Sequence, residues 1–195
     1  MLTLASTSVI RQQLLTNAGV EFEAIGANVD EDAIKDAMRG EGATPRAQAD
    51  KLAEAKAVRV SQKRGGLVLG CDQILAFGGQ SFDKSNTLEE ASERLKLLRG
   101  QTHSLECGVV IARDGVPIWR LVKSSHLTMR DFSDDFLAEY LSQHGQEALS
   151  SVGCYQFEGA GAQLFERVEG DYFAILGLPL LEVLAFLRLH GEAAL

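Results

Sequence analysis

Hydrophobic and polar positions follow two different periods along the chain, and together they predict a mixture of strands and helices. Short apolar or alternating runs predict strands at residues 2–6, 20–25, 67–69, 74–77, 102–111, 116–129 and 163–168. Apolar residues spaced three and four apart predict helices at residues 9–18, 44–63, 87–100, 134–142 and 178–190. Because strands and helices do not alternate strictly, we expect a mixed sheet flanked by helices, in an α/β or α+β fold.

The stretch from Leu67 to Lys84 contains the most informative polar residue of the chain. Two apolar runs, Leu67–Leu69 and Ile74–Phe77, enclose Asp72. A carboxylate between strand-like runs is costly unless it is solvated, paired, hydrogen-bonded or bound to a metal. Asp72 is therefore either a residue at a strand end or turn, satisfied by backbone N–H groups, or a catalytic group.

Three further positions could hold an anion or a metal ion. Ser6, Ser8 and Arg11 surround the start of the first helix, where free N–H groups and the helix dipole favour an anion; simple capping with a solvated arginine is the alternative. Lys56 lies in the apolar stripe of its helix, so its methylene stem can pack there. Its ammonium either reaches into a binding site or extends to solvent at the edge of the apolar surface. Glu31 lies in an acidic triplet that is either a solvated helix start or a ligand for a divalent cation.

Composition and charge narrow the class of protein. The chain has 195 residues, which favours one domain, and a formal net charge of -8, which argues against nucleic-acid or anionic-membrane binding. A small anionic ligand remains compatible with this charge. The three cysteines, Cys71, Cys107 and Cys154, form no C-x-x-C pair, so we expect buried free thiols in a reducing compartment. The chain shows no signal peptide and no apolar stretch of membrane-spanning length, so we expect a cytoplasmic protein.

Several familiar motifs are missing from the sequence. It contains no G-x-x-x-x-G-K-[ST] phosphate loop, no G-x-G-x-x-G fingerprint, no H-E-x-x-H zinc helix and no G-x-S-x-G nucleophile elbow. If the protein handles phosphates, it therefore uses scattered Lys, Arg and hydroxyl groups together with a metal. His103 is a weak candidate for acid–base work, and partial exposure at a strand start is the simpler interpretation.

Seven short motifs, in order along the chain, resemble the Maf family, the septum-formation-inhibitor group of nucleoside triphosphate pyrophosphatases. They are L-A-S-T-S-V-I-R-Q-Q-L-L at 4–15, V-D-E at 29–31, L-A-E-A-K-A at 52–57, G-C-D-Q at 70–73, L-R-G-Q-T-H at 98–103, G-D-Y at 170–172 and G-L-P-L at 177–180. Each motif alone is weak, but seven with family-like spacing are highly specific. The resemblance implies a single Maf/ITPase-like domain.

The resemblance also implies residue roles. It suggests that a nucleoside triphosphate is cleaved to the monophosphate and pyrophosphate, with a divalent cation, Mg²⁺ or Mn²⁺. Asp72 resembles the general base, Glu31 together with Asp72 the metal contacts, and Lys84 a catalytic phosphate lysine. The substrate-binding groups implied by the same motifs are Ser6, Ser8, Arg11 and Lys56.

Base choice in the family is associated with three positions, which here are Ile10, Gln73 and Glu158. Gln73 and Glu158 resemble the branch of the family that acts on 7-methyl-GTP. The dTTP/UTP-type members instead have Y-G-I-Q-G where this chain has Y-Q-F-E-G at 155–159, so they carry Gln at the position of Glu158. A carboxylate can accept hydrogen bonds from N1–H and the exocyclic amine of guanine, so a 7-methyl-GTP-like substrate is favoured.

Three alternatives remain open at this point. One is a dTTP/UTP-type pyrophosphatase, the second a non-catalytic, nucleotide-binding regulator of septum formation, and the third a nucleoside-diphosphate-linked hydrolase. The resemblance suggests a homodimer, for which the long strands around Trp119 offer a surface, and a possible role in cell division arrest.

Overall fold

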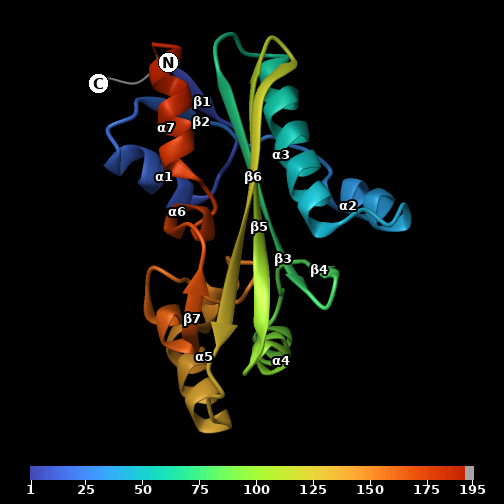
Figure 1. Ribbon diagram of the computed structural model, residues 1–195, viewed down its shortest axis with the longest axis vertical. Helices are drawn as coiled ribbons and strands as arrows, with labels where there is room; N and C mark the ends of the chain where they lie inside the picture. Colours follow the sequence, from blue (N-terminus) through green and yellow to red (C-terminus); the bar gives the residue numbers. More distant parts are fainter. Residues whose placement is uncertain (192–195) are drawn as a thin grey trace.

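Seven strands form one mixed sheet in the computed structural model, which describes residues 1–191 (Figure 1). β1 runs parallel to its neighbours β2 and β3, and the remaining pairs are antiparallel. The sheet order is β2 (Phe22–Ala24), β1 (Leu2–Leu4), β3 (Val68–Phe77), β5 (Thr102–Arg113), β6 (Val116–Met129) and β7 (Phe165–Glu169), and β4 (Gln80–Phe82) pairs with β3. The predicted mixed sheet flanked by helices is thus confirmed.

Helices cover the sheet differently at its two ends (Figure 1). At one end, α3 (Pro45–Ser61) lies on one face, and α1 (Val9–Asn17) and α7 (Leu180–Leu189) lie on the other. The opposite end carries α4 (Leu88–Leu98) and α5 (Asp134–Ala148). The remaining helical segments are α2 (Glu31–Gly40) beside α3, the 3-10 helix Ala160–Leu164, and the short α6 (Tyr172–Ile175).

Two large apolar clusters correspond to these two ends. The first joins β1, β3 and β5 to α1 and α7, and Trp119 packs against it through Phe186, with ring centroids 5.4 Å apart. The second joins α4 and α5 to β5 and β6. The long strands β3, β5 and β6 therefore connect two separately packed halves. The middle segment of β3, which contains Asp72, lies between these halves.

Hydroxyl residues begin three helices as the sequence indicates. The side chains of Thr44, Thr87 and Ser133 each accept a hydrogen bond from the backbone N–H three residues later, at distances of 3.2 Å. Such caps satisfy N–H groups that the helix itself leaves without an acceptor. The predicted starts of α3, α4 and α5 are thus confirmed.

Some predicted boundaries were wrong for reasons visible in the packing. The two runs around Asp72 form one continuous strand, because Gly70 to Gln73 pair throughout with β5. α5 continues past residue 142 to Ala148, since small buried residues, Gly145 and Ala148, extend its packed face. Residues 163–164 belong to the 3-10 helix rather than to a strand, and β2 is shorter than residues 20–25.

The cysteines and the character of the helices bear on two further predictions from the sequence. Cys71, Cys107 and Cys154 are buried and free, as the sequence indicates. Within residues 1–191, no helix has both the length and the apolar character that a membrane crossing requires.

Candidate active site

An interruption in the edge pairing of β3 defines the candidate site. On one side, β3 pairs with β1 at Val68 and Leu69 and with β4 at Leu75–Phe77. Between these pairings, residues 70–74 have no strand on that side within the described chain, and we call this segment the β3 gap. Because β1 leads into the start of α1 and β4 leads into Lys84, the gap brings these predicted phosphate-binding segments to Asp72.

Asp72 lies in the middle of the β3 gap and is only 6% exposed. Its Oδ1 is 2.7 Å from Nζ of Lys56, and the same ammonium is 2.9 Å from Oε1 of Glu31. Burial raises the pKa of Asp72, while the positive charges of Lys56 and Arg11 act in the opposite direction. Asp72 is thus an internal strand residue held by a cation, and of the two alternatives the strand end or turn satisfied by backbone N–H groups does not apply.

Glycines explain how α3 comes close enough for Lys56 to reach Asp72. A Cβ on Gly70 would lie 2.2 Å from the carbonyl oxygen of Ala53, and one on Gly108 would lie 2.4 Å from that of Ala49. Both glycines face α3, as Asp72 does, because side chains alternate along a strand and Gly108 pairs with Asp72. The bare backbone at these positions lets the helix lie directly on the strands.

Arg11 and Lys84 add positive charge to the β3 gap. The Arg11 guanidinium donates to the carbonyls of Gly177 at 2.8 Å and Cys71 at 3.1 Å, and to the hydroxyl of Ser6 at 3.2 Å. The pKa of Lys84 is lowered, first by desolvation and then by the nearby charge of Arg11. No residue of the described chain forms a hydrogen bond or ion pair with the Lys84 ammonium, which therefore remains available to an anion.

The start of α1 presents backbone N–H donors that no side chain of the described residues caps. Ser8 occupies the N-cap position, as the sequence predicts, and its side chain forms no capping hydrogen bond. Instead, the hydroxyl of Ser6 accepts from the N–H of Ser8 at 3.2 Å. The N–H groups in the first turn of α1 thus have no side-chain acceptor within residues 1–191. Such uncapped donors form a favourable binding site for an anion.

The three predicted base-choice positions have different surroundings. The amide nitrogen of Gln73 donates to the carbonyls of Ala174 at 2.9 Å and Ile175 at 3.0 Å, both on α6. Ile10 is partly buried against the first apolar cluster. Glu158 is exposed, and within residues 1–191 no hydrogen bond or ion pair connects it to another side chain. Contacts therefore join Gln73 to α6 but not to Glu158.

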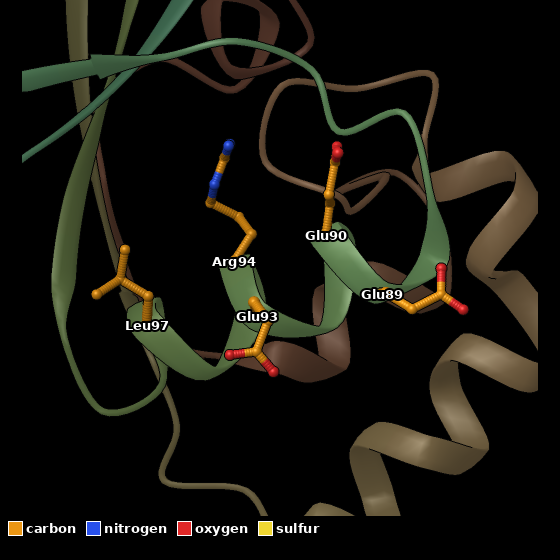
Figure 2. A pocket seen from close by; sticks show the side chains of 5 residues that line it. All are labelled: Glu89, Glu90, Glu93, Arg94 and Leu97. Atoms are coloured by element: carbon orange, nitrogen blue, oxygen red, sulfur yellow. The ribbon is translucent and has the colours of Figure 1, made fainter.

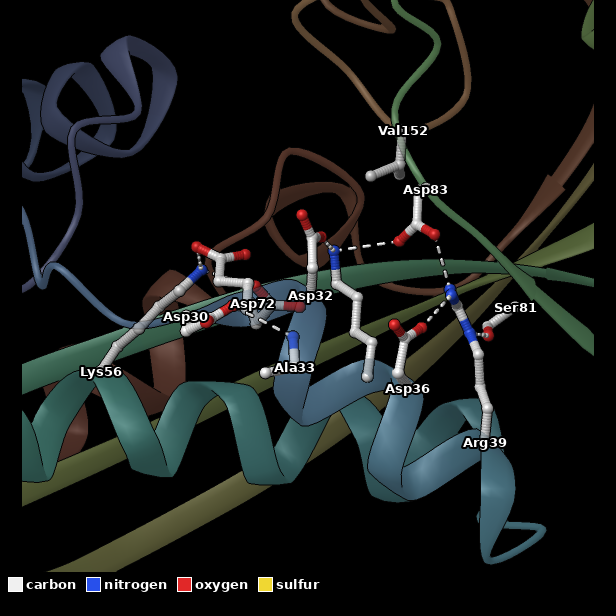
Figure 3. Close-up of polar contacts among 12 residues, drawn as sticks. Asp30, Asp32, Ala33, Asp36, Arg39, Lys56, Asp72, Ser81, Asp83 and Val152 are labelled. Carbon is white, nitrogen blue, oxygen red and sulfur yellow. Dashed lines mark hydrogen bonds and ion pairs between the residues drawn. The ribbon is translucent and has the colours of Figure 1, made fainter.

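The polar contacts that α2 makes with the segment after β4 were not predicted from the sequence (Figure 3). Lys35 and Arg39 of this helix bind the two carboxylate oxygens of Asp83, at 2.9 and 2.8 Å. Two signals were present: Asp83 directly precedes Lys84, and Glu31, Lys35 and Arg39 are spaced four residues apart. Without the structure, nothing related that stripe to the β3–β4 hairpin.

The donor set at the gap fits a magnesium-type cation bound jointly with phosphates. The carboxylates of Glu31 and Asp72 both contact the ammonium of Lys56, so they lie close together. In proteins, Mg²⁺ is commonly bound by one or two carboxylates together with the phosphates of a substrate. Within residues 1–191, no cluster of three His, Cys, Asp or Glu residues could hold a metal by itself. The carboxylates could thus hold the cation only with help from a ligand such as a triphosphate.

A hollow lies elsewhere on the surface, along one helix of the second half of the molecule (Figure 2). It lies along α4 and is lined by Glu89, Glu90, Glu93, Arg94 and Leu97. The carboxylate of Glu90 accepts from the N–H of Asn86 at 2.8 Å, so it stabilises the helix start. None of the predicted site residues lines this hollow.

Comparison with known proteins places the chain in a family whose fold agrees with the mixed sheet described above. The family model described as "Maf-like protein" matches residues 1–190, and the chain belongs to the Maf family. A nucleoside triphosphate pyrophosphatase from Caulobacter vibrioides is 57% identical over 189 residues, 97% of this chain and 95% of that protein. One of the same name from Hyphomonas neptunium is 53% identical over 188 residues (96% and 95%). A 7-methyl-GTP pyrophosphatase from Brucella abortus is 50% identical over 188 residues (96% and 94%).

Proposed function

We propose that this protein is a nucleoside triphosphate pyrophosphatase, which uses water to split the bond between the α- and β-phosphates. The observation that carries the proposal is a buried carboxylate, Asp72, in a strand gap lined by the cations Arg11, Lys56 and Lys84. Catalysis of phosphoryl transfer depends mainly on positioning and on electrostatic stabilisation, which this set of groups can supply. The printed names of the relatives support the same reaction.

Each residue has a defined role in the proposed reaction. Asp72 accepts a proton from the attacking water, which adds to the α-phosphorus as pyrophosphate leaves with the electrons of the broken P–O bond. Lys84, Lys56 and Arg11 neutralise the triphosphate. Ser6, Ser8 and the free N–H groups of α1 bind a phosphate oxygen.

A divalent cation, Mg²⁺ or Mn²⁺, would be held by Glu31 and Asp72 together with the phosphates. When bound, it would neutralise charge on the phosphate oxygens. Lys56 contacts both carboxylates, so it would keep their side chains oriented toward the same point.

For the base, we propose a guanine-like substrate, with 7-methyl-GTP favoured. The amide nitrogen of Gln73 is engaged by two backbone carbonyls, which can only accept, so its oxygen is the atom left for a ligand. Glu158 also accepts hydrogen bonds, and guanine offers two adjacent donors, N1–H and the exocyclic amine. The name of the Brucella abortus relative agrees with this choice.

A nucleotide panel tests the proposed reaction. Purified protein with Mg²⁺ is incubated with 7-methyl-GTP, GTP, UTP and dTTP, and pyrophosphate and inorganic phosphate are measured separately. We expect pyrophosphate and the monophosphate in equal amounts, fastest with 7-methyl-GTP, and release about 1,000-fold slower by Asp72→Asn. Release of inorganic phosphate alone, or nucleotide binding without turnover, would refute the reaction, and preference for UTP or dTTP would refute the base assignment.

Glu158→Gln tests how the base is read. The substituted amide keeps one acceptor and adds a donor, which suits a pyrimidine edge better than guanine. We expect the ratio of kcat/KM for 7-methyl-GTP over UTP to fall about tenfold, the effect of one changed hydrogen bond. Exposed Glu166→Gln on β7 is the matched control and should leave the ratio unchanged. An unchanged ratio in Glu158→Gln would show that this residue does not read the base.

A further inference from the structure

Helix α2, which carries Glu31, is attached to the molecule mainly through polar contacts. None of its residues is fully buried. Ile34 is its one partly buried side chain in an apolar cluster of the described chain, against Ala49, Leu52 and Ile74. Burial of one side chain contributes little compared with the entropy of ordering a ten-residue helix, so other interactions must help to hold this helix in place.

A charged stripe on α2 supplies these interactions (Figure 3). Glu31, Lys35 and Arg39 follow one another at four-residue spacing and therefore share one face of the helix. Glu31 contacts Lys56 of α3 at 2.9 Å, while Lys35 and Arg39 both bind Asp83 beyond β4. The stripe thus spans from the ammonium beside Asp72 to the residue before Lys84.

Asp83 is itself firmly held. Its backbone carbonyl accepts a hydrogen bond from Arg94 of α4 at 3.1 Å, and Arg94 also donates to the carbonyl of Val152 at 2.9 Å. Arg39 adds a hydrogen bond of 3.0 Å to the hydroxyl of Ser81. Asp83 therefore connects α2 to the half of the molecule that contains α4.

The ion pair between Asp83 and Lys35 keeps both partners charged at neutral pH. Burial acts to raise the pKa of Asp83, but hydrogen bonds from Lys35 and Arg39 outweigh it, and the pKa is lowered. The pKa of Lys35 is raised by Asp83, against the opposing effect of burial. Both groups stay charged near neutral pH, where the ion pairs are fully formed.

We propose that Asp83 is a positioning residue that holds α2 across the β3 gap, so that Glu31 and Lys84 face the same ligand. The roles of Glu31 and Lys84 rest on the function proposed above. Asp83 needs no contact with the substrate in this arrangement. It acts by restraining a helix that has little apolar contact of its own.

Hydrogen exchange tests this restraint without any measurement of activity. In Asp83→Asn, without nucleotide or metal, we expect amides of residues 31–40 to exchange about tenfold faster than in the wild type, because the helix opens locally. Residues 45–61 should be unchanged. Asp134→Asn is the matched control, since it breaks a comparable 2.7 Å pair with Arg99 away from α2, and should leave residues 31–40 unchanged. Unchanged exchange of α2 in Asp83→Asn would overturn the proposal.

A second variant and a kinetic measurement keep the test decisive. Lys35→Gln removes the partner of Asp83 on the helix and should accelerate the same amides, so a folding defect in Asp83→Asn would not hide the result. With pyrophosphate release as the assay, Asp83→Asn should lower kcat/KM about tenfold, as loss of a group that orients a metal-binding residue commonly does. Asp83→Glu should restore most of this loss. If the wild type releases no pyrophosphate, the proposed function fails, while the exchange result still decides the role of Asp83.

Discussion

Asp72 and His103 are both almost fully buried titratable residues on neighbouring strands, and their surroundings are opposite. Asp72 is 6% exposed and meets the ammonium of Lys56 within 2.7 Å. His103 is 2% exposed, shares a 2.7 Å hydrogen bond with the hydroxyl of Tyr155, and lies beside the ring of Phe165, with centroids 6.0 Å apart. Burial lowers the pKa of His103 to about 4.

This difference shows that burial of a titratable group does not by itself indicate a site. Charges from several elements converge on Asp72, whereas His103 lies beside the rings of Tyr155 and Phe165 and its burial favours the neutral form. The expectation that His103 is partly exposed was wrong, because β7 and Tyr155 cover the start of β5. A perturbed pKa points to function only where a specific charged partner and an accessible gap accompany it.

The largest expected effect comes from Asp72→Asn, which keeps the shape of the side chain and removes the base. We expect pyrophosphate release to fall about 1,000-fold, the usual contribution of a general base. Because the pKa of Asp72 is raised in the folded state, its ionised form costs folding free energy above the unfolded pKa. The melting temperature of Asp72→Asn in EDTA at pH 8 should therefore not fall below that of the wild type. Turnover near the wild-type rate would remove Asp72 from its proposed role.

An intermediate effect is expected from protonation of His103. The folded-state pKa is about 4 and the ordinary value is 6.5, so the unfolded chain binds the proton first as pH falls. Stability from neutral His103 is complete above pH 6.5 and is lost as pH falls toward 4. Between pH 7.5 and 5 this loss amounts to about 2 kcal/mol of unfolding free energy.

Urea unfolding of two histidine variants checks this prediction. His103→Gln should show a smaller loss between pH 7.5 and 5 than the wild type. His126→Gln, which removes an exposed histidine on β6, should keep the wild-type pH dependence. Equal pH dependence in all three proteins would contradict the assignment of His103 as a buried neutral group.

The smallest expected effect is that of Tyr155→Phe, which leaves Nε2 of His103 without its partner. His103 Nδ1 is already buried without a hydrogen bond in the described chain, so the ring would lose its one polar contact there. We expect a loss of about 1.5 kcal/mol in unfolding free energy and an unchanged kcat. A large fall in kcat with intact stability would instead place the aromatic region in the reaction.

Local patterns in the sequence were sufficient for most elements. The caps at Thr44, Thr87 and Ser133 and the spacing of apolar residues located three helices and their starts. The continuity of β3 was not predictable in this way, because Gly70 and Asp72 are held in the strand by pairing with β5. Cross-strand pairing depends on residues distant in sequence, and local propensity does not contain it.

The candidate site was predictable to the same limited extent. Lys56 was identified from its position within an apolar stripe, and the structure brings it to Asp72 and Glu31. Asp83 was not identified, because its partners, Lys35 and Arg39, lie more than forty residues earlier in the chain and only the fold brings them together. Motif spacing thus identified single groups, whereas the contacts between the groups required the fold.

The β3 gap has a consequence for the solubility of the protein. Unpaired backbone groups at the edge of a sheet can pair with a strand from another molecule and so start aggregation. Here the guanidinium of Arg11 occupies the Cys71 carbonyl, and the buried charges of Asp72 and Lys56 would have to be covered by any incoming strand. The arrangement that keeps the gap open to a small charged ligand therefore also discourages the addition of a foreign strand.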